Sequence, residues 1–582
     1  MYSPPPRLRT VPYAFVASLA LAAGACGSPS KAPASPAGAA AQPAPPPPPT
    51  FRFIPSDTSY AVVNVAPPPA PYVDHVLAEL AAELDGLSAD IEAVRAQAEL
   101  APPERLLVAA FDTFHGRLTR AGLAELGFAP QPRVALYGVD LMPALRLELA
   151  DGAAVEGLIN ELLTGAEMPV PRDELDGHGY WFFDIPGQGV AAIVAVVDDQ
   201  LVLAAAPSAP APLRRAHIAT LLTGPARAVT HSRRFETLAR THGLGEHAQI
   251  VVDLQGAFDK LFGEPGARLP AELRGELASL SDTCQTEIRG LVATLPRLAL
   301  GLQAAPGADV DLAIAIDTSH AASLRALETP VPGLGAAPDQ RNLISMGIAL
   351  DIDGALAFIE QRAQAVRAQP FQCEYLVELN QAADELVANL AESSQQLPAI
   401  ARDPRGLYVA LRDGDFSQDP PSKLQAMVIL AMKRPALLVD MARAFVPQLS
   451  GLELQPNGAP AELPLPPLPE PVFDTPRVAL TEGAVGVSVG ATMEPELAAA
   501  MSTPPAAAGP LLRLDLDLVR VAALAVAQGD EFPEPLRAFA RGQLLIDAGE
   551  TGVVIRAHGT FDHASAQRAE ASAAPTKRVS AR

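Results

Sequence analysis

The sequence predicts an α+β protein built from two similar halves, and three observations lead to this prediction. The chain has 582 residues, which is too long for one typical domain of about 100–200 residues. Short apolar strands that end in or near Asp or Asn, and lead into helix-like sequence, recur four times along it. Each of these is followed by a pair of apolar, strand-like segments, and antiparallel strand pairs with separate helices are typical of α+β domains.

The four opening strands come first in each repeated unit. An Asp or Asn at their end can cap the following helix by accepting hydrogen bonds from its free N–H groups. The openers are residues 60–65, 250–254, 344–351 and 511–515.

The strand pairs follow these openers after helix-like sequence. They are residues 133–139 with 145–150, 297–303 with 311–317, 406–412 with 426–432, and 543–548 with 552–558. The first and third units carry an extra strand, at residues 199–203 and 482–486, followed by a helix. The repeats therefore divide the body into a first half over residues 51–290 and a second half over residues 291–563.

Composition excludes several classes of protein. Hydrophobic residues make up 49% of the chain, charged residues 19% and aromatic residues 5%, so the chain is neither a coiled coil, nor collagen-like, nor wholly disordered. The formal charge is 43 − 66 = −23. Such an acidic chain is a poor binder of nucleic acid, because phosphate contacts need Lys and Arg, and charge does not draw it to anionic membranes.

The N-terminus has the pattern of a secretory signal. Arg7 and Arg9 precede an apolar run from Val11 to about Ala23, and this run is too short to span a membrane. The small residues before Cys26 resemble the lipobox of bacterial lipoproteins, although Ala23 stands where that motif usually has Leu. An ordinary secretory signal with an incidental Cys is the alternative.

The resemblance to lipoproteins implies where in the cell the protein is located. It implies that residues 1–25 are removed and that Cys26 is acylated, and several acyl chains anchor a protein stably. Gly27, rather than Asp, follows the Cys, which by the same resemblance points to the outer membrane with the body facing the periplasm; the inner membrane and surface display remain open. The mature charge is then 41 − 66 = −25.

Two terminal segments lack the apolar periodicity that packing needs. Residues 26–50 are rich in Pro and Ala, and we expect a tether leaning to polyproline II that reaches at most roughly 70 Å at about 3.1 Å per residue; a ligand for a proline-binding groove is the alternative. Residues 564–582 are small, polar and basic and are expected to be disordered.

The start of the body carries a second resemblance. The stretch Phe53-Ile54-Pro55-Ser56-Asp57-Thr58-Ser59-Tyr60 resembles the beginning of uncharacterised bacterial envelope proteins, and residues 147–151 resemble their next block. This resemblance implies a duplicated periplasmic fold and no known activity, so it lends no catalytic residues.

Cys284 and Cys373 remain once Cys26 is assigned to the lipid anchor. In an oxidising periplasm two such residues favour a disulfide, and two separate buried thiols are the alternative. Neither lies in a C-x-x-C motif, so redox catalysis and structural zinc are not expected.

Motifs for catalysis are weak. Residues 486–490 match the G-x-S-x-G pattern of hydrolases, with Asp530 and His558 available to follow Ser488. That pattern requires a sharp strand-to-helix turn at the Ser, whereas Ser488 is predicted to lie within a strand. A catalytic site is therefore not expected.

Two further clusters contain residue types that form binding sites in other proteins. His231, His242 and His247 lie close in sequence to Asp253, but their spacing places no two ligands on one helix face, so neither a metal site nor a cofactor is predicted. Residues 180–183 (Tyr-Trp-Phe-Phe) form the one dense aromatic cluster. On a strand its members alternate between faces, as part of the core or of a contact patch.

The sequence thus predicts a lipid-anchored, non-enzymatic binding or scaffold module that contacts an envelope protein. The alternative is a periplasmic carrier or sensor of a hydrophobic ligand held between the two halves. A hydrolase is the third and weakest hypothesis.

Overall fold

The computed structural model combines helices with antiparallel β-structure, so the α+β class is confirmed. It describes residues 48–561 except 98, 186, 188, 209, 267–268, 270, 305–308, 337–338, 397–401, 417–421, 465–475, 505–508, 534–535 and 538. The signal, Cys26, most of the tether and the tail lie outside the described residues. Among the helices of the described part, none is long and apolar enough to cross a membrane.

The chain forms two compact units. Unit 1 comprises Met1–Ser281 and Arg289–Ile314, and unit 2 comprises Asp282–Ile288 and Ala315–Arg582. The sequence had set the border after residue 290, whereas the packing of the chain assigns the next strand mainly to the first unit.

Unit 1 contains an antiparallel sheet with the strand order β4-β5-β6-β7-β3-β2-β1-β8-β9. The strands are β1 (Tyr60–Val63), β2 (Val134–Val139), β3 (Met142–Glu148), β4 (Arg172–Leu175), β5 (His178–Ile185), β6 (Val190–Val197), β7 (Gln200–Pro207), β8 (Ala248–Asp253) and β9 (Arg297–Ala304). The next strand, β10 (Asp309–Asp317), pairs with β9 and includes the border between the units.

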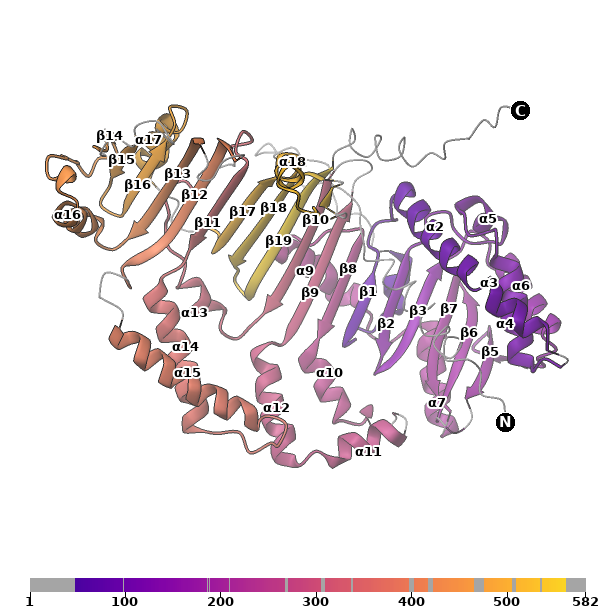
Figure 1. Ribbon diagram of the computed structural model, residues 1–582. Helices are drawn as coiled ribbons and strands as arrows, with labels where there is room; N and C mark the ends of the chain where they lie inside the picture. The colour runs from indigo at the N-terminus through magenta and orange to yellow at the C-terminus, as the bar shows by residue number, and fades with distance from the viewer. Residues whose placement is uncertain are drawn as a thin grey trace, which may run out of the picture. The chain divides into compact units, whose positions relative to one another are not determined.

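Helices cover both faces of this sheet (Figure 1). Val155 of α6 packs on Leu147, Val196 and Leu201, while α7 lies on the opposite face, where Arg146 reaches its backbone. The helical elements are η1 (Pro49–Phe53), α2 (Ala70–Gly86), α3 (Ser88–Arg95), α4 (Pro102–Phe114), α5 (Arg120–Glu125), α6 (Gly152–Gly165), α7 (Ala211–Thr223), α8 (Val229–Ser232), α9 (Arg234–His242), α10 (Leu254–Leu261), α11 (Ala271–Ser279) and α12 (Asp282–Thr294), whose first residues belong to unit 2.

Unit 2 contains an antiparallel sheet with the order β14-β15-β16-β13-β12-β11-β17-β18-β19. The strands are β11 (Ile344–Ala349), β12 (Pro404–Asp415), β13 (Ser422–Met432), β14 (Ala461–Glu462), β15 (Arg477–Leu480), β16 (Ala484–Val489), β17 (Leu512–Asp517), β18 (Phe539–Ala548) and β19 (Gly552–Phe561). The helical elements are α13 (Ala321–Arg325), α14 (Ile352–Ala368), α15 (Val377–Gln396), α16 (Pro435–Phe445), η4 (Pro447–Leu449), α17 (Glu494–Ser502) and α18 (Leu518–Gln528).

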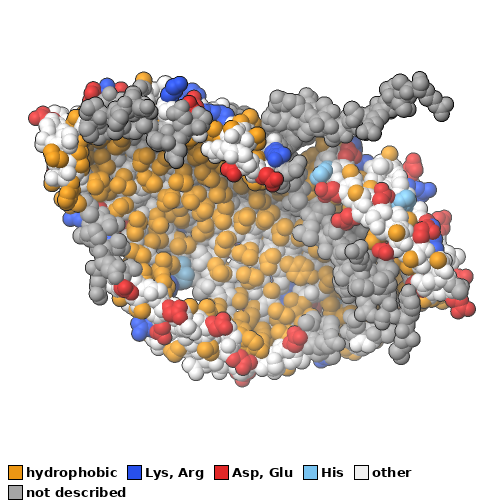
Figure 2. Space-filling model, viewed as in Figure 1, with side chains coloured by type: hydrophobic (Ala, Val, Ile, Leu, Met, Phe, Trp, Pro, Cys, Tyr) orange, Lys and Arg blue, Asp and Glu red, His pale blue; other side chains and the backbone are white. Residues whose placement is uncertain are grey.

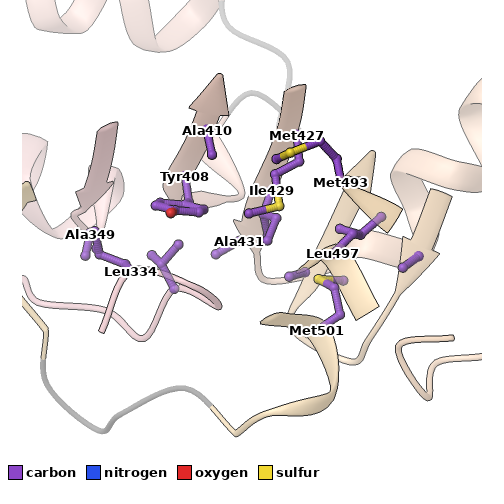
Figure 3. Packing of buried hydrophobic residues seen from close by; sticks show 13 residues of the cluster. Leu334, Ala349, Tyr408, Ala410, Met427, Ile429, Ala431, Met493, Leu497 and Met501 are labelled. Atoms are coloured by element: carbon purple, nitrogen blue, oxygen red, sulfur yellow. The ribbon is translucent and has the colours of Figure 1, made fainter. Parts of the chain in front are cut away.

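The core of unit 2 lies on one face of its sheet. Tyr408 and Ile429 pack there with Leu334, Leu497 and other buried apolar residues (Figure 3). Gly486 of β16 allows this packing, because a Cβ at that position would lie 2.5 Å from Leu497 Cδ1. Burial in this core raises the pKa of the Tyr408 hydroxyl.

The predicted strand pairs all occur as neighbouring strands: β2 with β3, β9 with β10, β12 with β13 and β18 with β19. The predicted caps hold in part. The Asp253 carboxylate accepts from Gly256 N of α10 at 2.8 Å, whereas Asp351 before α14 makes no such bond. Before α18 the capping residue is Asp517, two positions after the predicted opener.

The predicted disulfide joins Cys284 of α12 to Cys373, in the connection between α14 and α15. Both cysteines are buried. The Glu287 carboxylate, one turn along α12, accepts from the backbone N–H groups of Gln372 and Cys373 at 2.8 and 2.9 Å. This connection is thus held to α12 by a covalent bond and by hydrogen bonds.

Candidate functional site

The outstanding surface of unit 2 is the sheet face opposite its core. On β13, β12, β11, β17, β18 and β19, alternate residues form what we call the open face, and all of them are aliphatic or Met except Gly542 and Gly559 at the end of one row. Strand register places them in three rows across the sheet. The rows are Ala426–Leu411–Ile344–Leu516, Val428–Val409–Met346–Leu514–Leu544–Ala557, and Leu430–Leu407–Ile348–Leu512–Ile546–Ile555.

The open face is exposed to an unusual degree for such side chains. Val428 is 43% exposed, Ile348 37% and Met346 36%, although all three lie on central strands of the sheet. Figure 2 shows apolar side chains gathered over the strands that Figure 1 labels β11 to β13, β17 and β18. Apolar residues on central strands normally lie beneath another layer.

The other side of β17 and β18 is polar. Arg513 pairs with the Asp515 carboxylate at 2.7 Å, and Gln543 donates to the same carboxylate at 2.5 Å. Because side chains alternate along a strand, the apolar residues of β17 and β18 point to the open face, except Leu545, which lies on the other side opposite Arg513. Strands that alternate in this way normally bury their apolar side, whereas here the apolar side is the one that forms the open face.

Neighbouring elements limit the open face at its margins. Next to β13, on β16, Val485 and Val487 are covered by a cluster that includes α16 and η4. Over β18, Leu518 of α18 lies where a Cβ on Gly542 would approach it to 3.3 Å. The Phe539 ring lies similarly close to Gly559 of β19.

The size of the open face can be derived from sheet geometry. Six strands about 4.8 Å apart, each contributing up to three alternate residues about 6.8 Å apart, span about 29 Å by 20 Å, or roughly 600 Å². The largest apolar patch of a typical monomer is about 300–600 Å² and is often functional. The open face therefore reaches the size at which a binding role is expected.

A second candidate for a binding site is a cleft lined by charged residues, which lies in unit 1 beside α10. It has a volume of about 540 Å³. Arg234 binds the Asp253 carboxylate at 2.8 Å, and Lys260 binds that of Asp57 at 3.0 Å. Burial lowers the pKa of Arg234, and the charge of Asp253 opposes this shift. Because these cations already have carboxylate partners, the cleft has no evident preference for an anion.

The hydrolase motif does not form a nucleophile elbow. Ser488 lies inside β16, opposite Met427 of β13 and Arg477 of β15, and it is 1% exposed. An elbow would need the Ser exposed at a strand-to-helix turn, and here Gly490 to Met493 separate it from α17. The sequence prediction of a strand Ser is confirmed.

The histidines have separate local roles. His231 accepts from Ala228 N in a helix-capping contact at 3.3 Å, and His242 is buried in α9. Burial lowers the pKa of His247. No group of three metal-ligating side chains exists in the part of the chain that the structure describes.

The aromatic cluster lies on β5, as predicted, with its members alternating between faces. Trp181 is buried at 2% exposure, and its neighbours are half-buried. The guanidinium of Arg172 lies 5.7 Å from the Trp181 ring centroid, and that of Arg214 lies 5.0 Å from the Phe182 ring centroid. The cluster thus contributes to the core of unit 1 through Trp181.

Comparison with known proteins adds no assignment, since neither a scan against protein families nor searches of curated proteins and of solved structures find a match.

Sequence reasoning missed the open face. The signal was the period-two alternation in residues 344–350 and 512–517, but alternation alone does not reveal which side of a sheet stays uncovered.

Proposed function

We propose that this protein is a non-catalytic lipid-binding lipoprotein of the bacterial envelope, which holds the acyl chains of a lipid on the open face of unit 2. The observation that carries the proposal is a six-strand apolar face with its alternation directed toward the uncovered side. Among the sequence-based hypotheses this favours the hydrophobic-ligand carrier over the protein-binding scaffold, with the ligand on one sheet rather than between halves.

The chemistry of the open face supports an acyl chain over a protein partner. Its side chains are Ala, Val, Leu, Ile and Met, which offer no hydrogen-bond donor. Protein interfaces make about one hydrogen bond per 100–200 Å² and are enriched in Tyr, Trp and Arg. An acyl chain needs neither hydrogen bonds nor aromatic anchors, so the face matches it.

The charge of the chain narrows the lipid class. Without residues 1–25 the formal charge is 41 − 66 = −25, which disfavours the approach of anionic headgroups. The ligand is therefore expected to be zwitterionic or uncharged, with phosphatidylethanolamine as the probe of choice.

The lipid anchor belongs to the same proposal. Acylation of Cys26 would hold the protein at the outer membrane, within reach of lipid, at the end of the tether over residues 26–50. The test is mass spectrometry of the N-terminal peptide together with membrane fractionation. Cys26→Ala is expected to release the protein into the soluble periplasmic fraction, and an unmodified Cys26 in the wild type would contradict the anchor.

We also propose that the two units arose by duplication, as the sequence repeats predicted. Support comes from the sheet orders, which match when β1, β2, β3 and β7 to β9 are placed on β11, β12, β13 and β16 to β18. Tyr137 of β2 and Tyr408 of β12 are then equivalent buried residues.

The decisive experiment is native mass spectrometry of residues 27–582 produced in a bacterial periplasm, followed by lipid extraction. A bound mass in the range of one diacyl lipid, lost on denaturation, is the expected result. Met346→Glu and Val428→Glu should abolish it, because each puts a charge in the central row. Leu437→Glu, at 38% exposure on α16, is the matched control and should retain the lipid.

Three results would contradict the proposal. They are a wild-type protein free of lipid that also takes up none from phosphatidylethanolamine vesicles, a homodimer dissolved by Met346→Glu, and a bound peptide in place of lipid. The last two would assign the open face to a second copy of the chain or to a protein partner.

A further inference from the structure

A second apolar feature lies in unit 1, between α2 and the sheet. It is a cavity of about 110 Å³, lined on one side by Val73, Val76, Leu77 and Leu80 of α2 and on the other by Phe128 and Leu147. It shares no residue with the open face of unit 2, so its role is independent of the function proposed above.

Two of the polar residues that line this cavity, Arg120 and Asn64, are engaged in other bonds. Arg120 binds the Asp74 carboxylate through two bonds, from Nε at 2.6 Å and from Nη2 at 2.9 Å. The side-chain oxygen of Asn64 accepts from Val134 N at 3.0 Å, and the side-chain NH₂ group of Asn64 donates to His247 O. With the cation neutralised and the amide bonded on both sides, neither of these two groups is directed at a ligand, and Tyr72 is the remaining polar residue of the lining.

Helix α2, which forms one wall of the cavity, buries few of its residues against the rest of unit 1. Over its 17 residues only Leu77 and Leu80 are buried, and the helix begins after Pro69 without a side-chain cap. A helix held by two buried residues and by the exposed Asp74–Arg120 pair can shift outward at low cost, which would widen the entrance of the cavity for a ligand.

We infer that this cavity is a binding site for a small aliphatic molecule, which places a short alkyl group in it. Apolar cavities of about 150 Å³ remain dry and take up small hydrocarbons, and this cavity is of comparable size and lining. Water would find few partners in it, because Arg120 and Asn64 are already bonded. An alkyl group needs only the contacts that its lining offers.

The test uses 1-hexanol as the probe and the methyl NMR signals of Leu and Val in the protein comprising residues 27–582. Titration should shift the methyl signals of Val73, Val76, Leu77, Leu80 and Leu147. Val76→Trp should fill the cavity and weaken hexanol binding by about tenfold or more. The control is Ala82→Trp, on the exposed side of the same helix, which should bind as the wild type does.

A second variant guards against misfolding of the first. Leu147→Ala enlarges the cavity, so the best-binding member of a series of 1-alkanols should become longer. The inference is overturned if hexanol leaves these methyl signals unchanged, or if Val76→Trp and Ala82→Trp bind equally well. Shifts confined to Val428, Val409 and Leu514 of the open face would place hexanol on that face alone, which would contradict the cavity site and leave the proposed function standing.

Discussion

Arg146 of β3 is the residue whose replacement tests the packing of unit 1 most directly. It is fully buried, and no carboxylate is among its hydrogen-bond partners. Its Nε donates to the Tyr137 hydroxyl at 3.0 Å, Nη1 donates to the Gln200 side chain at 2.9 Å, and Nη2 donates to Leu221 O. The guanidinium lies 3.4 Å from the Phe53 ring centroid. Burial lowers its pKa, which reflects the cost of holding this cation away from water.

Arg146→Met keeps an unbranched, mostly apolar side chain, although a shorter one, and removes all three hydrogen bonds. At about 1–1.5 kcal/mol for each lost bond, with the acceptors left unpaired in the interior, we expect a loss of about 3–5 kcal/mol in the free energy of unfolding. This is a large share of the roughly 5–15 kcal/mol typical of a domain. For a unit of this size the melting temperature should fall by about 10 °C.

The assay is urea unfolding followed by tryptophan fluorescence. Trp181 is the only tryptophan of the chain, and it lies on β5 of unit 1, so the signal reports that unit alone. Arg95→Met is the control, because Arg95 forms surface ion pairs with Glu92 and Asp112, and such pairs contribute about 0–1 kcal/mol. Replacing buried charges by apolar residues stabilises some proteins. An Arg146→Met variant as stable as the wild type would therefore refute the reasoning that its three hydrogen bonds outweigh its desolvation.

Two further predictions concern unit 2. Reduction of the Cys284–Cys373 bond, which spans 89 residues, should destabilise the protein by up to about 4–5 kcal/mol. In the double variant Cys284→Ser, Cys373→Ser, the melting temperature should no longer depend on reductant. A dependence that persists in this variant would contradict the prediction. The Arg341 guanidinium, which hydrogen-bonds to Asp339, lowers the pKa of that carboxyl. A depressed carboxyl pKa stabilises the fold above the unfolded pKa of about 4 and loses this effect as the pH falls below it. Arg412 of β12 also binds Asp339, so hydrogen exchange in β12 should rise below about pH 4 in the wild type. It should rise less in Asp339→Asn. Equal responses of the two proteins would rule out this carboxyl as the cause.

Strands whose residues are strongly apolar were predictable. Residues 250–254 and 426–432 fall within or next to β8 and β13, because a β-branched, apolar run bounded by polar residues has few other solutions. Other strands were missed. The run 190–197 forms β6 although all of its residues are apolar, because a continuous apolar run cannot be distinguished from a buried helix by its period. Strand β4 is mostly polar, while β14 has two residues and β15 four, too few for any periodic signal.

The sequence by itself determined the α+β class, the strand pairs and the absence of a hydrolase elbow at Ser488, since these depend on residues close along the chain. It also made the Cys284–Cys373 bond the natural pairing, by leaving two cysteines for the body. Tertiary structure alone decided that the aliphatic side of β11 to β13 and β17 to β19 is the exposed one, and that α2 leaves a cavity above Phe128 and Leu147. Alternation assigns side chains to two faces, but only the packing of the helices and connections, which are distant in sequence, determines which face they cover.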